Sequence, residues 1–137
     1  MIRHFQKGDL EKIKLQSEQK NEDSQQWHLF DDEDTIVFAD GDKVLAIVRP
    51  FFESGQRVWL SALIGVDCGY KAVAMFKQMK RIIDGFLQEG EAQRVEMVTQ
   101  ADFAAANRLA GMLGFECEGT MKKYFNGIDF NLWGRTE

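Results

Sequence analysis

The chain has 137 residues, of which 45% are hydrophobic and 28% charged, and its formal net charge is −5. This length fits one domain with its own core, and the balance of residue types excludes a disordered chain. The negative charge argues against a general nucleic-acid binder, because neutralising phosphates requires a basic face.

The N-terminal quarter predicts a short strand, a helix and a polar stretch. Ile2–Phe5 is predicted as a strand that Gly8-Asp9 ends, with Asp9 as the N-cap of a helix over Leu10–Lys20. Residues 21–34 are polar and end in a run of acidic side chains. We expect this run to be a solvated loop; a role in attracting a basic substrate is the alternative.

Three β-rich segments follow, joined by tight turns. They are Thr35–Ala39, Val44–Phe52 and a strand from Arg57 to about Val66. Asp40-Gly41 and Ser54-Gly55 are typical turn sequences between apolar runs. Consecutive strands with short connections predict an antiparallel meander.

A long amphipathic helix is predicted after the polar turn Asp67–Tyr70, with Gly90 as its C-terminal stop. Its apolar positions recur every three or four residues: Val73, Phe76, Met79, Ile83 and Phe86. A strand that runs through a glycine-bearing turn into a helix leaves backbone N–H groups unpaired at the helix start. Together with the helix dipole, these groups form a site for a phosphate or another anion.

The next segments predict a strand and a second long helix. Arg94–Thr99 alternates as a strand, and Asp102 is the expected cap of a helix over Phe103–Leu113. Gly114 stands where a left-handed residue commonly ends a helix.

The C-terminal segments predict a hairpin. Phe115–Phe125 and Ile128–Arg135 are the strands, and Asn126-Gly127 indicates a type I′ turn between them. The expected fold is a single α+β domain over residues 1–137, in the order β-α-β-β-β-α-β-α-β-β, with a mixed, mostly antiparallel sheet flanked by helices.

Several short motifs occupy the last third of the chain. They are Leu113-Gly114-Phe115, Glu116-Cys117-Glu118-Gly119, Lys122-Lys123-Tyr124, Asn126-Gly127-Ile128-Asp129 and the late Arg135. Together with the order of elements, they resemble the GCN5-related N-acetyltransferase (GNAT) family, and are similar to its small, divergent members encoded by tailed bacteriophages. The resemblance covers most of the chain in topology and the last third in motif.

The resemblance implies that the strands beginning at Arg57 and Arg94 diverge and that acetyl-CoA, or another acyl-CoA, lies between them as co-substrate. The cofactor-binding residues that it implies are Leu63, Ile64, Gly65, Cys68, Gly69, Tyr70, Lys71, Ala72 and Asn107. An amine would then attack the thioester directly, with a base and an acid handling the protons. Two alternatives stay open: Lys71 as an ordinary solvated lysine, and Asn107 as a local packing residue.

The chain departs from the family pattern at two places. The pyrophosphate loop of the family reads Q/R-x-x-G-x-G/A, and with Gly69 as the first glycine its outer positions are Val66 and Lys71. The tyrosine that usually acts as acid, four residues before Gly114, is replaced by Ala110. An alanine cannot supply a proton.

The remaining catalytic candidates are Tyr124, Asp67 and Ser61. Two of them have a structural alternative: a buried phenol with one hydrogen bond for Tyr124, and the N-cap of the long helix for Asp67. Cys68 lies at a helix start, which favours a reactive thiol, but a lone cysteine more often acts as a small apolar residue.

Two functions follow from these patterns. The first is an N-acyltransferase that acts on a small-molecule or protein amine. The second is a catalytically degenerate GNAT-fold binding or assembly protein, such as a phage accessory or virion protein. Acetyl-CoA binding and turnover discriminate between them.

The sequence also sets expectations about metals, partners and location. The spacing of the two cysteines and two histidines suggests no metal site and a reduced, intracellular protein. We expect no nucleic-acid or membrane partner, because there is neither a basic excess nor an apolar run of about 20 residues. The N-terminus lacks the apolar region of a signal peptide, which predicts a cytoplasmic protein, in the host cytoplasm if phage-encoded. Exposed strand edges would allow a homodimer.

Overall fold

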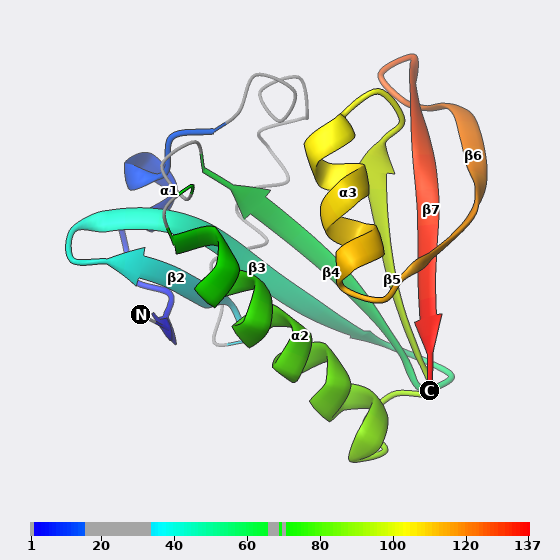
Figure 1. Ribbon diagram of the computed structural model, residues 1–137, viewed down its shortest axis with the longest axis horizontal. Coiled ribbons are helices and arrows are strands. Elements are labelled where there is room, and N and C mark those ends of the chain that lie inside the picture. Colours follow the sequence, from blue (N-terminus) through cyan, green and yellow to red (C-terminus); the bar gives the residue numbers. More distant parts are fainter. Residues whose placement is uncertain (1, 16–33, 66–68, 70) are drawn as a thin grey trace. The chain divides into compact units, whose positions relative to one another are not determined.

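A computed structural model describes residues 2–15, 34–65, 69 and 71–137 (Figure 1). The later part of the predicted first helix and the acidic run up to residue 33 lie outside the described residues. So do Asp67, Cys68 and Tyr70.

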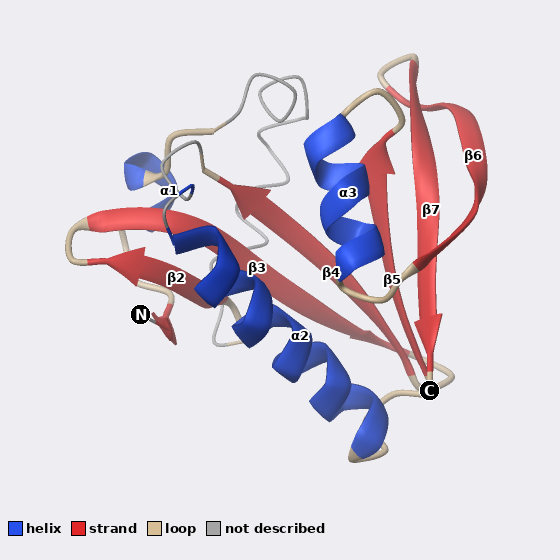
Figure 2. Cartoon of the chain, in the orientation of Figure 1, coloured by secondary structure: helices blue, strands red, loops and turns tan. Residues whose placement is uncertain are grey.

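The helices and strands follow the predicted order (Figure 2). They are β1 (Ile2–His4), α1 (Asp9–Lys12), β2 (Ile36–Asp40), β3 (Lys43–Glu53), β4 (Arg57–Ile64), α2 (Ala72–Gln88), β5 (Arg94–Gln100), α3 (Ala104–Met112), β6 (Glu116–Phe125) and β7 (Ile128–Thr136). The strands are hydrogen-bonded in the order β1-β2-β3-β4-β5-β7-β6. The pair β4–β5 is parallel, whereas β1–β2, β2–β3, β5–β7 and β6–β7 are antiparallel. The predicted mixed, mostly antiparallel sheet is confirmed.

Contacts between residues divide the chain into two compact units. The first unit comprises Met1–Pro50 and Ser61–Met75, and the second comprises Phe51–Leu60 and Phe76–Glu137. The first unit therefore holds β1, α1, β2, most of β3, the end of β4 and the start of α2. That the whole chain is one domain stays a prediction.

The first unit has a core of aliphatic side chains from the N-terminal segment and three strands. Its buried residues are Ile13, Leu15, Val37, Ala39, Val44, Ile47 and Leu63, with Phe5 and Leu10 packed against them. Branched side chains on paired strands pack well on a pleated surface, which is why these segments form strands.

Asp9 does not cap α1, contrary to the sequence prediction. The N-cap is Gly8, with a φ of 95° and no side-chain cap. Asp9 is the first helical residue, and its buried carboxylate accepts hydrogen bonds from both terminal nitrogens of Arg3 at 2.8 Å and from the N–H of Gln6 at 2.7 Å. The ion pair to β1 thus replaces the local cap.

The first helix is also shorter than predicted. It ends at Lys12, and Ile13 has extended dihedral angles, φ −76° and ψ 133°. Ile13 and Leu15 are both buried while Lys14 between them is exposed. This alternation is typical of an extended segment, since side chains two residues apart point to the same side.

The buried face of α2 is rotated from the predicted one. The buried side chains are Met75, Met79, Ile83 and Leu87. Val73, predicted as part of the apolar stripe, is 68% exposed, and Phe76 and Phe86 are half-buried. Both stripes have helical spacing, so periodicity alone did not identify the face that packs.

In the second unit, one local prediction is wrong and two are confirmed. The N-cap of α3 is Phe103, without a side-chain hydrogen bond, so Asp102 does not cap it. Gly114 has a φ of 90° and donates its N–H to Gly111 O, as a left-handed residue after a helix does. Asn126 and Gly127 have φ of 51° and 74°, the positive pair that a type I′ hairpin requires.

An ion pair crosses β7 in the second unit and requires a glycine beneath it. Strand β7 lies between β5 and β6 (Figure 1). Arg94 on β5 donates to Glu118 on β6, with Nη1 2.9 Å from Oε2, and to Glu96 on its own strand, with Nε 2.7 Å from Oε1. A Cβ on Gly134 would lie 2.6 Å from both terminal nitrogens of Arg94.

We therefore expect Gly134→Ala to lower the free energy of unfolding by about 1–3 kcal/mol, because the methyl group displaces the Arg94 side chain. Urea denaturation measures this. Gly111→Ala on α3 is the matched control: its Cβ would meet nothing within 4 Å, and alanine favours a helix. Equal losses in the two variants would contradict the prediction.

No helix in the described part of the chain is both long enough and apolar enough to cross a membrane.

Candidate functional site

The parallel pairing of β4 with β5 is short. Its register joins Arg57 to Arg94, Val58 to Val95 and Trp59 to Glu96, and it ends there. Beyond this point β4 continues to Ile64, and β5 continues to Gln100 in register with β7 on its other edge. The second half of β4 is thus not in register with β5.

The side chains at the end of β4, in the first unit, are largely buried, so a ligand there would contact mainly backbone groups. Leu63 is only 1% exposed and belongs to the core, while Ser61 and Ile64 are half-buried. Gly65 donates its N–H to Leu45 O on β3 at 2.8 Å. A Cβ on Gly65 would lie 3.0 Å from Leu45 O, so the close approach of the two backbones favours glycine.

The start of α2, in the same unit, has features of an anion site. The first turn of α2 contains no acidic residue that would offset the positive end of the helix dipole. Gly69 is exposed, and a Cβ there would meet nothing within 4 Å. Lys71 and Ala72, at the helix start, are half-buried. Four of the predicted cofactor residues, Gly65, Gly69, Lys71 and Ala72, therefore lie in one unit.

The extended segment after α1 also reaches the end of β4. Leu15 forms an isolated antiparallel bridge with Gly65. In Figure 1 the blue N-terminal segment runs from α1 toward this end of β4. The sequence prediction of a helix over these residues missed this contact; the alternation of Ile13, Lys14 and Leu15 is the signal that could have found it.

Asn107 on α3 lies in a polar network of the second unit. Its Nδ2 donates to the carbonyls of Ala101 and Phe103, both at 3.1 Å, and of Gln100 at 3.3 Å. Its Oδ1 accepts hydrogen bonds from Thr99 on β5 and from Asn131 on β7. The hydrogen-bonding capacity of the amide is thus used within the protein, as the packing interpretation of Asn107 expects.

The catalytic candidates are divided between the two units. Ser61 lies on β4 in the first unit. Tyr124 lies on β6 in the second; it is 48% exposed and its ring lies 5.5 Å from that of Phe130. Ala110, at the position of the usual acid, is fully buried and accepts a hydrogen bond from Phe115 N–H. The predicted role of each candidate stays a prediction.

Several motif residues of the last third have structural roles. Glu118 pairs with Arg94, which lowers the pKa of the Glu118 carboxyl. Arg135 donates to Leu113 O at 3.2 Å and pairs with Asp84 on α2, which lowers the pKa of the Asp84 carboxyl. These contacts join β6 to β5, and β7 to α2 and to the end of α3, so the motifs indicate the fold more directly than the chemistry.

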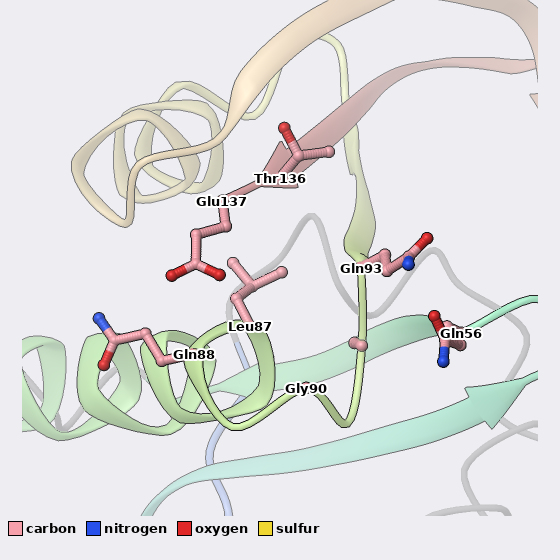
Figure 3. A pocket seen from close by; sticks show the side chains of 8 residues that line it. Gln56, Leu87, Gln88, Gly90, Gln93, Thr136 and Glu137 are labelled. Carbon is pink, nitrogen blue, oxygen red and sulfur yellow. The ribbon is translucent and has the colours of Figure 1, made fainter.

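A hollow of about 450 Å³ in the second unit lies near the C-terminal end of β7 (Figure 3). Its lining consists of Gln56, Leu87, Gln88, Gly90, Ala92, Gln93, Thr136 and Glu137. Glu137 is its one ionisable side chain, and Figure 3 shows that side chain extending toward Leu87 and Gln88. Nothing in this lining resembles a catalytic pair. Within the described residues, no three His, Cys, Asp or Glu side chains are placed to hold a metal ion.

Comparison with solved structures identifies this arrangement. Ard1 from Thermoplasma volcanium superposes with a TM-score of 0.75 and 16% identity, over 99% of this chain and 96% of that one. The chain has the GNAT fold. A GNAT-family acetyltransferase from Streptococcus pneumoniae matches with a TM-score of 0.70 and 18% identity, over 99% and 98% of the two chains. A chimera of spermidine N-acetyltransferase SpeG from Vibrio cholerae and hSSAT gives 0.72 and 17%, over 99% and 95%.

Two further GNAT-fold structures contain coenzyme A derivatives. RimL, a ribosomal L7/L12 α-N-protein acetyltransferase, is in complex with coenzyme A, and the immunity acetyltransferase MccE is in complex with acetyl-CoA and AMP. This chain covers 60% of each, with TM-scores of 0.64 and identities of 16% and 17%. No family model and no curated protein matches the sequence.

Proposed function

We propose that this protein binds an acyl-CoA, in the first place acetyl-CoA, along the end of β4 and at the start of α2, and transfers the acyl group to an amine. The proposal depends on one observation in a chain with the GNAT fold: the pairing of β4 with β5 stops at Trp59 and Glu96, well before β4 ends. A strand edge that leaves its neighbour early is suited to pair with an extended ligand that carries amides, as the pantetheine arm does.

The residues present fit such a ligand. The pantetheine arm would lie along the end of β4, where Leu63 and Ile64 are, and the close packing at Gly65 would set where the strand ends. Gly69, Lys71 and Ala72 would hold the pyrophosphate through N–H groups, the helix dipole and a point charge. The predicted contributions of Cys68 and Tyr70 concern residues that the structure does not describe.

The thioester supplies an activated acyl group, so the protein's task is to hold the amine in line and to move two protons. Ser61, Asp67 and Tyr124 stay the candidates for proton transfer. GNAT-fold neighbours act on small molecules, as spermidine N-acetyltransferase does, and on proteins, as RimL does. The acceptor of this chain is therefore proposed only as a small-molecule or protein amine.

The second candidate function is a GNAT-fold binding or assembly protein without catalysis. Ala110 favours it, because a fully buried alanine with a hydrogen-bonded carbonyl stands where the family's acid usually stands. Binding of acetyl-CoA without turnover on a panel of amines would support this function. A cytoplasmic location, a phage origin and a homodimer stay predictions.

We expect Gly69→Glu to weaken acetyl-CoA binding at least about tenfold in isothermal titration calorimetry, which corresponds to ~1.4 kcal/mol. A carboxylate ~4 Å from a phosphate costs about 4 kcal/mol at an effective dielectric constant of ~20. The substitution meets open space, so the fold should tolerate it.

Gln88→Glu is the matched control, since it adds the same charge at an exposed position on the other end of α2. It should change the affinity less than about twofold, because a surface charge some 20 Å away is screened by salt. A flat titration of the wild-type protein at high concentration would overturn the proposed function.

A further inference from the structure

We propose that the segment Ile13–Leu15 and the acyl-CoA compete for one edge of β4, so that the chain itself covers part of its cofactor strand until Leu15 leaves. This inference rests on the proposed function, because it assumes that the cofactor arm uses this edge. It adds a regulatory contact that the fold alone does not imply.

The hydrogen bonds at Gly65 determine which edge of β4 the segment covers. A strand has two edges, and β3 occupies one of them at this position, because Gly65 donates its N–H to Leu45 O at 2.8 Å. The bridge between Leu15 and Gly65 must therefore form on the other edge. The order β3-β4-β5 shows that this other edge is the one that pairs with β5 at the start of β4. It is the same edge that the proposed cofactor arm needs.

The segment is held firmly against β4 by packing. Ile13 and Leu15 are both buried in the core cluster that contains Leu63 of β4. Beside Gly65, the position of a Cβ lies 3.2 Å from Ile13 Cγ1 and 3.3 Å from Lys14 O. No ligand atom fits between the segment and the strand at this distance, so the two cannot share the edge at Gly65.

The pairing itself is limited, which makes displacement feasible. In the part of the chain that the structure describes, Leu15 and Gly65 form an isolated bridge. The helix before the segment has only four residues, Asp9–Lys12, and its ion pair to Arg3 is made by its first residue. An arm with several amides could replace this one bridge. The apparent dissociation constant then equals the intrinsic one divided by the fraction of molecules in which the edge is uncovered.

Calorimetric titration with acetyl-CoA tests the competition. Leu15→Ala removes most of the side chain that seats the segment and should tighten binding at least about fivefold. Ile47→Ala is the matched control: Ile47 is buried in the same cluster but lies on β3, away from the contested edge. The affinity of Ile47→Ala for acetyl-CoA should stay within twofold of that of the wild type.

The four outcomes separate the inference from the proposed function. Tighter binding in Leu15→Ala alone supports the competition. Unchanged affinity in Leu15→Ala, or equal tightening in both variants, overturns the competition and leaves the cofactor proposal intact. No binding by the wild type or by either variant overturns the proposed function, and the inference with it.

Hydrogen exchange of the wild-type protein gives a second test that needs no variant. With saturating acetyl-CoA, the amides of residues 13–15 should exchange faster, while those of residues 61–65 and 72–75 should exchange more slowly. Faster exchange at 13–15 is the signature of displacement. Slower or unchanged exchange there, with protection at 61–65, would show that the cofactor binds without displacing the segment.

Discussion

Replacing Arg3 with methionine is expected to lower the free energy of unfolding by about 3–5 kcal/mol at pH 7. The Asp9 side chain is 1% exposed, and Arg3 is its one charged partner within hydrogen-bond distance in the described residues. Methionine keeps the apolar stem but leaves a buried carboxylate without its hydrogen-bonded counter-charge. Urea denaturation at pH 7 measures the loss.

Between pH 7 and pH 5, the free energy of unfolding should change with pH in opposite directions in Arg3→Met and in the wild type. In the wild type, burial raises the pKa of Asp9, but hydrogen bonds from Arg3 and Gln6 outweigh it, and the pKa lies below its usual 3.8. A carboxyl with a lowered pKa stabilises the fold above its unfolded pKa, and this contribution is lost as the pH falls below about 5. In Arg3→Met burial dominates and raises the pKa, so stability should increase from pH 7 toward pH 5.

A double variant supplies the control for this ion pair. Arg3→Met with Asp9→Asn removes the buried charge as well, so it should lose less stability than Arg3→Met alone and show little pH dependence over the same range. If the single variant kept the acid sensitivity of the wild type, the buried pair would not be the source of that sensitivity.

Asn107→Ala is expected to lower the free energy of unfolding by about 2–4 kcal/mol, because several hydrogen bonds of ~1 kcal/mol each are lost and their partners are left without one. The network that loses them joins α3 to β5 and β7 through Thr99 and Asn131. Trp133 donates its Nε1–H to Thr99 at 2.9 Å, which extends the same network along β7. Thermal and urea unfolding measure the loss.

Arg108→Ala, on the exposed side of α3, is the matched control for Asn107 and should change stability by less than ~0.5 kcal/mol. Acetyl-CoA titration of Asn107→Ala then distinguishes the two interpretations of this residue. Lower stability with unchanged affinity supports the packing role. Unchanged stability with a tenfold weaker affinity would show instead that Asn107 contacts the cofactor.

Apart from Tyr124, the residues that carried the family resemblance differ from those that would carry the chemistry. Glu118 and Arg135 form ion pairs with Arg94 and Asp84, and Asn126-Gly127 forms a turn. All of them lie in the second unit, whereas most of the proposed cofactor contacts lie in the first. The C-terminal motifs therefore predicted the fold, whereas the proposed acyl-CoA site lies at the end of β4 and the start of α2.

Local features were predictable because their causes act within a few residues. The positive φ of Gly114, Asn126 and Gly127 follows from residue types that adopt it at low cost, and the order of elements follows from apolar periodicity. A local signal failed where the side chain found a partner outside its own helix. Asp9 has the sequence context of a helix cap, but its carboxylate pairs with Arg3 on a neighbouring strand.

By itself, the sequence determined which segments form strands and helices, where most turns fall, and that the fold is GNAT-like. Only the tertiary structure decided which face of α2 is buried, how far β4 follows β5, and that Leu15 pairs with Gly65. The physical reason is that these three features depend on which strand edges and side-chain faces meet across long separations along the chain. Hydrophobic periodicity indicates that one face of an element is buried, but it does not indicate which surface that face packs against.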